Sequence, residues 1–77
     1  MRESMVETNS VVELKALLGR KARDVNTGFE GVLSAFAFYD HGKMPMLHIS
    51  GLDLNGRPVA IWLDRNQVRL LGCDNLQ

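Results

Sequence analysis

The stretch at residues 24–39 constrains the fold more than any other part of the sequence. A polar loop containing Gly28 and Gly31 runs directly into the longest strand-like segment, residues 32–39. The two glycines let the backbone bend sharply on either side of Phe29. The segments that follow have the composition of strands that pair back onto this one. The sequence therefore predicts a small β domain organised around residues 32–39.

A short helix is predicted ahead of the first strand. Ser10 and Glu13 have the spacing of a capping box, in which each side chain accepts from the other residue's backbone N–H. Gly19 stands where a left-handed C-terminal cap is expected. The apolar residues at helical spacing are Val11, Leu14, Leu17 and Leu18. We expect a helix over residues 10–18 that is too short to be stable alone and must bury this stripe.

Five strands are predicted, separated by turns rich in glycine, asparagine and aspartate. They are expected at residues 20–25, 32–39, 46–52, 59–64 and 68–71, with a polar single turn at 64–67 before the last. This pattern predicts a mainly β fold, a five-stranded SH3-like small barrel with a short N-terminal helix; an open curved sheet is the alternative. The single domain would span residues 10–72, between a flexible N-terminus at 1–9 and a tail at 73–77.

The loop after residue 53 decides which side chains share a face of the sheet. A two-residue turn at Asn55-Gly56 would mix apolar and charged residues on one face. A three-residue loop at 54–56, with Gly56 left-handed, separates them, and a slip of one residue inverts the faces. We choose the three-residue loop, which pairs Ile49 with Ile61 and Leu47 with Leu63.

The preceding hairpin, centred on residues 42–43, is then predicted to pair Phe36 with Ile49 and Phe38 with Leu47. The first face forms the predicted core, joined by Val68 and Leu70. Its members are Phe36, Phe38, Leu47, Ile49, Val59, Ile61 and Leu63. The second face consists of Leu33, Ala35, Ala37, Tyr39, Met46, His48, Ser50, Ala60 and Trp62.

The second face is too apolar to be an ordinary solvated face, so something must cover it. The helix at 10–18, a partner or second subunit, and a small-molecule ligand are the three alternatives, and an exposed apolar patch is typical of an interaction site. Aromatic side chains with polar tips are favoured at interfaces. The candidate partner-binding residues are Tyr39, Met46, His48 and Trp62.

The charges of the chain give little support to nucleic-acid binding. Nine basic and nine acidic residues cancel, which argues against bulk binding to nucleic acid or to an anionic membrane and leaves little repulsion against self-association. The alternative function uses a small basic cluster, Arg20, Lys21 and Arg23, on the first strand, where it could contact phosphates.

No pattern in the sequence predicts catalysis, a cofactor or a metal site. His41 and His48 are the two histidines, and no thiolate or carboxylate cluster accompanies them at ligand spacing. The serines lack a nucleophile motif. The single cysteine, Cys73, excludes an internal disulfide and indicates a reducing compartment, so we expect a cytoplasmic protein. No apolar run approaches the length of a membrane span.

One set of short motifs resembles a family. The chain contains a short basic strand that ends in Asp24, a Thr-Gly-Phe-x-Gly loop at 27–31 and a His-Gly turn at 41–42. An Asp-x-x-Gly loop at 53–56, a Trp-x-Asp strand at 62–64 and Gln67 follow. In this order they resemble small phage- and prophage-encoded proteins that are SH3-like and have no established activity. The resemblance covers residues 18–71 and implies no catalytic residues; the helix and the apolar segment before Trp62 depart from it.

These observations predict a non-enzymatic protein-interaction module, encoded by a phage or mobile element and able to self-associate. It would bind a protein partner or a second copy through the second face or a free strand edge. The alternative is a nucleic-acid-binding accessory protein.

Overall fold

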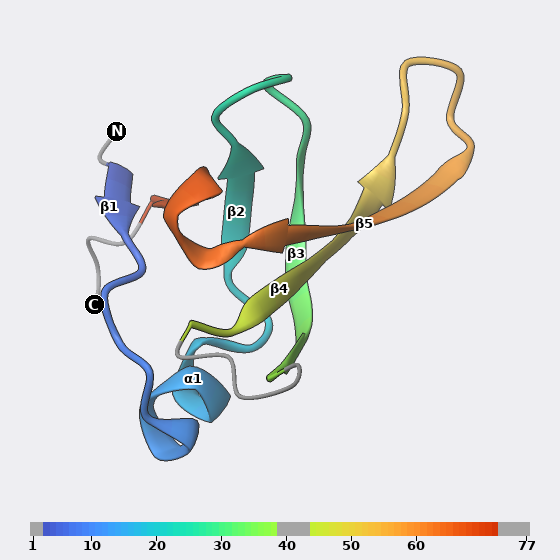
Figure 1. Ribbon diagram of the computed structural model, residues 1–77. Helices are drawn as coiled ribbons and strands as arrows, with labels where there is room; N and C mark the ends of the chain where they lie inside the picture. The colour runs from blue at the N-terminus through green and yellow to red at the C-terminus, as the bar shows by residue number, and fades with distance from the viewer. Residues whose placement is uncertain (1–2, 39–43, 73–77) are drawn as a thin grey trace.

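The computed structural model describes residues 3–38 and 44–72 as a mainly β domain with one short helix (Figure 1). Six antiparallel strands form one sheet in the order β1-β6-β2-β3-β4-β5. The strands are β1 (Glu3–Met5), β2 (Lys21–Asp24), β3 (Glu30–Ala37), β4 (Met46–Leu52), β5 (Pro58–Asp64) and β6 (Val68–Leu71). The helix α1 (Val11–Leu17) precedes β2, and the 3₁₀ turn η1 (Arg65–Gln67) joins β5 to β6.

The mainly β prediction is confirmed, but a five-stranded barrel is not what the described residues form. Their sheet has six strands and ends at β1 and β5 without closing, as in the alternative of an open curved sheet. The extra strand, β1, lies in the segment predicted to be flexible. It pairs with β6 through Ser4 and Leu70, and Val6 directly after it is only 2% exposed. A three-residue strand followed by one buried valine is too short to show a period in the sequence.

The helix begins and ends close to the predicted positions. Ser10 Oγ accepts from Glu13 N–H at 3.4 Å, which is half of the predicted capping box. The return bond comes from another residue: Ser10 N–H donates to Thr8 Oγ1 at 2.9 Å, and the Thr8 hydroxyl donates to the Glu13 carboxylate. Gly19 has φ +93°, the left-handed conformation expected after the last turn.

The helix packs on the same face of the sheet as the core. Leu14 is fully buried, and Leu17 packs against the same cluster. The buried members of this core cluster are Val6, Leu14, Ala22, Leu33, Leu47, Ile49, Val68 and Leu70. The alternative in which the helix covers the second face is therefore wrong. We call that second face, opposite α1, the outer face.

The β4–β5 hairpin has the predicted three-residue loop. Gly56 has φ +78°, and the observed register includes both predicted pairs, Leu47 with Leu63 and Ile49 with Ile61. Asp53 fixes the loop because its Oδ1 accepts from the N–H groups of Asn55 and Arg57 at 2.8 and 2.9 Å.

The β3–β4 pairing differs from the prediction in two ways. Phe36 pairs two residues earlier on β4 than predicted, and β3 contains a β-bulge between Leu33 and Ala35. The bulge adds one residue to β3, so the alternation of faces is interrupted there. Leu33, predicted on the second face, pairs with Ile49 and is fully buried in the core. Phe36 pairs with Leu47 in the place predicted for Phe38.

Phe38 lies beyond the end of β3 and is 39% exposed, so its assignment to the core is wrong. Its ring meets that of Phe36 edge to face, with centroids 6.4 Å apart. Phe36 is therefore the aromatic residue of β3 that packs against the core, and Phe38 lies at the margin of the core.

The loop from β2 to β3 is held by a buried carboxylate. Asp24 is 2% exposed, and its two oxygens accept from Asn26 N–H at 2.9 Å and from the Thr27 hydroxyl at 2.8 Å. Its backbone carbonyl accepts from Gly28 N–H, and Gly28 has φ +80°. The loop therefore has the same aspartate-centred design as the loop at 53–57.

Replacing Asp24 with alanine is expected to lower the free energy of unfolding by about 1–3 kcal/mol, because two donors lose their partners near the core. Urea unfolding followed by circular dichroism measures this change. Asp53→Ala removes the equivalent bonds in a more exposed loop and serves as the control, with a smaller expected loss. Equal losses for the two variants would contradict the role given to burial.

Candidate interaction surface

The outer face is built as three rows of residues across β3, β4 and β5. The first row contains Val32, Ser50 and Ala60; the second Ala35, His48 and Trp62; and the third Ala37, Met46 and Asp64. Strand alternation puts all of these side chains on the side opposite Leu47 and Ile49. The described members of the predicted face are thus present apart from Leu33, with Val32 in its place.

His48 and Trp62 are neighbours at the centre of this face. Their ring centroids are 4.8 Å apart, with an angle of 53° between the ring planes. The hairpin register makes them a directly opposed pair, as predicted. Met46 lies on the same face two residues along β4, so three of the four candidate partner-binding residues come together. The fourth, Tyr39, lies outside the described residues.

Ser34 holds the imidazole of His48 in position. The bulge brings the Ser34 hydroxyl to 2.5 Å from His48 Nδ1 and 3.2 Å from the His48 carbonyl oxygen. A serine beside a histidine is the first half of a nucleophilic site, which also needs a group that orients the base. In the described part of the chain no carboxylate is hydrogen-bonded to His48. We interpret the contact as one that fixes the ring beside Trp62.

Sequence reasoning missed Ser34 because the residue looks unremarkable in the chain. Its hydroxyl reaches His48 only because of the bulge between Leu33 and Ala35. A strict alternation would have placed Ser34 on the core side. A polar serine at a core position was the one signal in the sequence that the strand is irregular there.

The side chains of the outer face are partly accessible. Trp62 is 43% exposed and Val32 40% exposed, although both are large and apolar. The small side chains of Ala35, Ala37 and Ala60 project little from the sheet around the indole. Such a surface lets another backbone approach closely, and an exposed tryptophan at its centre has the character of an interface anchor.

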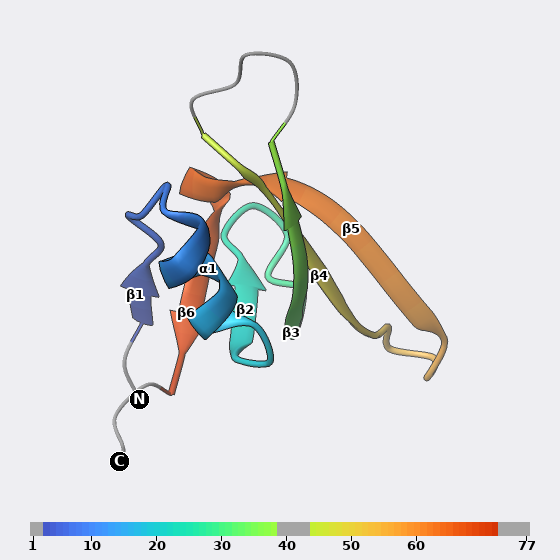
Figure 2. The ribbon, with the colours of Figure 1, turned by 90° about the horizontal axis from the view of Figure 1, so that it is seen from below.

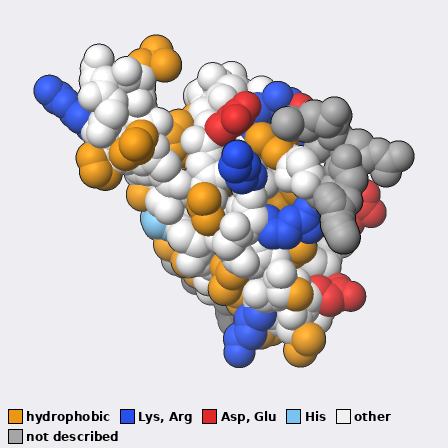
Figure 3. Space-filling view, turned by 180° about the vertical axis from the view of Figure 1, so that it is seen from behind, with side chains coloured by type: hydrophobic (Ala, Val, Ile, Leu, Met, Phe, Trp, Pro, Cys, Tyr) orange, Lys and Arg blue, Asp and Glu red, His pale blue; other side chains and the backbone are white. Residues whose placement is uncertain are grey.

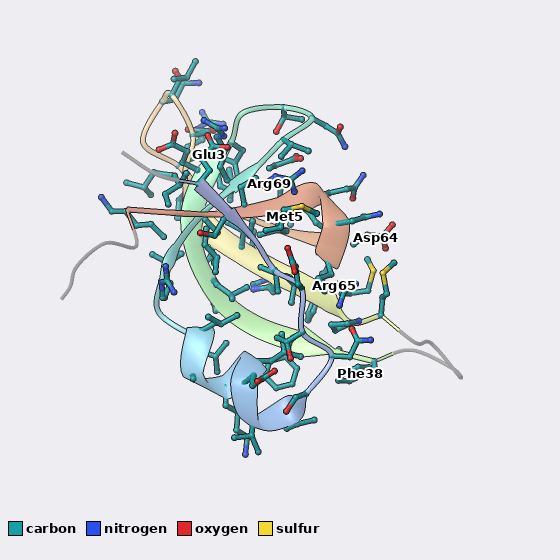
Figure 4. The ribbon with its side chains drawn as sticks, turned by 90° about the vertical axis from the view of Figure 1, so that its left-hand side faces the viewer. Glu3, Met5, Phe38, Asp64, Arg65 and Arg69 are labelled. Carbon is teal, nitrogen blue, oxygen red and sulfur yellow. The ribbon has the colours of Figure 1, made fainter. Side chains whose placement is uncertain are left out.

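The basic cluster is not a single patch. Lys21 is exposed, Arg20 is half-buried before β2, and Arg23 forms an ion pair with Glu3 of β1. Figure 4 shows Glu3, Met5 and Arg69 at this side of the sheet, with Asp64 and Arg65 at the turn into β6. In Figure 3 the Lys and Arg side chains of the visible face are separated by neutral and hydrophobic ones. The three predicted nucleic-acid-binding residues are thus close in sequence but differ in surroundings.

One hollow lined by described residues lies away from the outer face. It has a volume of about 740 Å³ and is lined by residues 5–10, by Leu70, and by Glu13, Ala16 and Leu17 of the helix. A small-molecule pocket on the second face, one of the three alternatives, gains no support from this position.

Two further properties were sought in the described residues. Within 3–38 and 44–72, no group of three or more histidine, cysteine or acidic side chains is arranged to hold a metal ion. The helix found in the same ranges is far shorter and less apolar than one that crosses a bilayer.

Comparisons with known proteins add nothing to these observations. No family model, curated protein or solved structure matches the chain. The resemblance to small phage-encoded proteins remains an expectation from the sequence motifs.

Proposed function

We propose that the protein is a non-enzymatic protein-interaction module that binds its partner through the outer face of β3, β4 and β5. The observation that carries this proposal is the position of the helix. Because α1 packs on the core face, the described residues leave His48, Met46 and the exposed indole of Trp62 on the opposite side. An apolar surface of this kind on a small domain is typical of an interaction site.

The strand order supports an SH3-like description of the fold as part of this proposal. The strands β2 to β5 follow one another as a meander, and β6 returns after the 3₁₀ turn to pair with β2. In the described residues this order is extended by β1 and is left open at β5, where a barrel would close.

Nucleic-acid binding through Arg20, Lys21 and Arg23 has less support. Arg23 is already paired with Glu3, and the chain as a whole has no net charge. Phosphate binding depends on several cations that are available together.

Replacing Trp62 with alanine is expected to leave the domain folded and to abolish partner capture. A half-exposed ring contributes less to stability than a core ring, so we expect a loss of about 1–2 kcal/mol in the free energy of unfolding. Capture from cell lysate is compared between the wild type, Trp62→Ala and Val12→Ala, which removes an exposed apolar side chain on the helix.

The proposal predicts that the wild type and Val12→Ala retain the same protein and that Trp62→Ala loses it while keeping its circular dichroism spectrum. If all three capture the same protein, the outer face is not the binding surface. If Trp62→Ala unfolds, the indole belongs to the structure of the domain and the site assignment fails.

A further inference from the structure

The two edges of the sheet differ in how well they are protected against a further strand. β1 is three residues long and carries Glu3, which are two usual protections of an edge. β5 is seven residues long, and no charged residue occurs between Pro58 and Asp64. Within the described residues no strand pairs with its far side, and Figure 2 shows β5 along the outside of the sheet.

Backbone hydrogen bonds show which groups of β5 face this open edge. Asp53 N–H donates to the Arg57 carbonyl at 2.9 Å, so residues 53 and 57 are a hydrogen-bonded pair in the β4–β5 register. Such pairs alternate with non-bonded pairs in an antiparallel ladder. Residues 59, 61 and 63 therefore bond to β4, and the even-numbered residues point outward. Pro58 agrees with this assignment, because a proline has no N–H to give to the ladder.

Both ends of the outward edge are closed to a further strand. Pro58 lacks a donor, and Asp64 N–H is accepted by Gln67 Oε1 at 3.2 Å. Ala60, which is exposed, has its N–H in the middle of the edge. A strand that pairs with β5 must therefore be centred between these ends, because neither end offers it an N–H donor.

We propose that two copies of the chain join edge to edge through β5, antiparallel and centred on Ile61. The inference rests on the proposed function and names a second copy of the chain as the partner. In this register Ala60 N–H of each copy donates to the carbonyl of residue 62 in the other. The closed end at Pro58 faces the closed end at Asp64, so no N–H is left without an acceptor there, and the carbonyls of these two exposed residues can bind water.

The side chains of β5 are complementary to themselves in this register. On the outer face, the small Ala60 of one copy lies opposite the large Trp62 of the other, which fits the indole without a clash. On the inner face, half-buried Val59 faces Leu63, and Ile61 faces its own equivalent. A two-fold contact requires this self-complementarity, and the zero net charge adds little repulsion. The dimer would contain one continuous sheet with the two outer faces side by side.

Replacing Ala60 with proline tests the pairing directly. The Ala60 N–H is not used in the β4–β5 ladder, so the variant is expected to keep the monomer fold while losing the intermolecular bonds. Sedimentation of the wild type at high concentration should give twice the 8.6 kDa chain mass, and Ala60→Pro should weaken dimerisation by at least about tenfold. Ala60→Ser retains the N–H and the small side chain, and should remain dimeric.

Amide exchange of the wild type gives a second measurement that needs no substitution. The Ala60 N–H should exchange slowly at high concentration and quickly on dilution, whereas the Ile61 N–H, bonded to β4, should be protected at both. A monomeric wild type, or a dimer in which Ala60 exchanges equally fast at both concentrations, overturns the β5 pairing. Protection of Ala60 only in the presence of another protein also overturns it.

These outcomes separate the inference from the proposed function. Loss of capture in Trp62→Ala would still support the outer face if the β5 pairing fails. Conversely, a dimer that persists in Trp62→Ala but not in Ala60→Pro would support the edge while leaving the outer face without a partner.

Discussion

Replacing Gly31 with alanine is expected to lower the free energy of unfolding by about 3 kcal/mol or more, the upper end of the cost of overpacking. A Cβ atom at residue 31 would lie 2.4 Å from the carbonyl oxygen of Ser50 and 2.8 Å from Ile49 Cγ2. The Ser50 atom belongs to the backbone of β4 and cannot rotate away. The strands β3 and β4 would have to separate at this point.

The neighbouring glycine takes part in the same close approach. A Cβ atom at Gly51 would lie 2.9 Å from the carbonyl oxygen of Glu30 and 3.1 Å from Gly31 Cα. The backbones of β3 and β4 therefore come together at two glycines, one from each strand. A side chain at either position would therefore push the two strands apart.

Gly28 provides the matched control for Gly31→Ala. It has φ +80° and open space around its Cα, so Gly28→Ala costs backbone strain of about 1–2 kcal/mol without a clash. Chemical unfolding of both variants and the wild type measures the difference. A Gly31→Ala variant as stable as Gly28→Ala would show that β3 and β4 are not held in such close contact.

Replacing Leu14 with alanine is expected to cost about 2–5 kcal/mol, because the side chain is fully buried and its removal leaves a cavity. A domain of this size has little stability to lose, so the variant is expected to be partly unfolded at room temperature. The helix is only seven residues long and depends on this contact rather than on its own propensity.

Val12→Ala is the control for Leu14→Ala within the same helix. Val12 is 78% exposed, and alanine is the better helix former, so the change should lie within about 0.5 kcal/mol of the wild type. Thermal unfolding of the three proteins measures both effects. If Leu14→Ala were as stable as Val12→Ala, the helix would not be docked on the core as described.

The sequence was sufficient to predict the β4–β5 hairpin and the pair of residues at the centre of the outer face. The loop at 54–56 and the separation of apolar and polar side chains select one register, and that register makes His48 and Trp62 neighbours. Turn type and binary pattern both act locally, so a single sequence contains the information needed.

The bulge in β3 could not be predicted in the same way. Residues 32–37 read as an unbroken strand, and a regular alternation that places Phe36 in the core puts Leu33 outside. The fold instead turns both residues toward the core, Leu33 fully buried and Phe36 half-buried, with Ser34 in the bulge between them. The energetic gain from burying a second large side chain against Ile49 depends on tertiary packing, which periodicity does not report.

The placement of α1 also depends on the tertiary structure. The stripe that contains Leu14 shows that one side of the helix is buried, but it does not show which face of the sheet the helix covers. The same limit applies to β1 and to the Arg23–Glu3 ion pair, because both join residues that are far apart in the sequence.

The central claim is that α1 packs on the core face of the sheet, opposite the outer face that carries Trp62. Nuclear Overhauser effects from the methyl groups of Leu14 and Leu17, measured on dilute wild-type protein, test it most directly. We predict contacts from these methyls to the core cluster that contains Leu33 and Ile49. Contacts from the same methyls to the indole of Trp62 or the imidazole of His48 would place the helix on the outer face and contradict the claim.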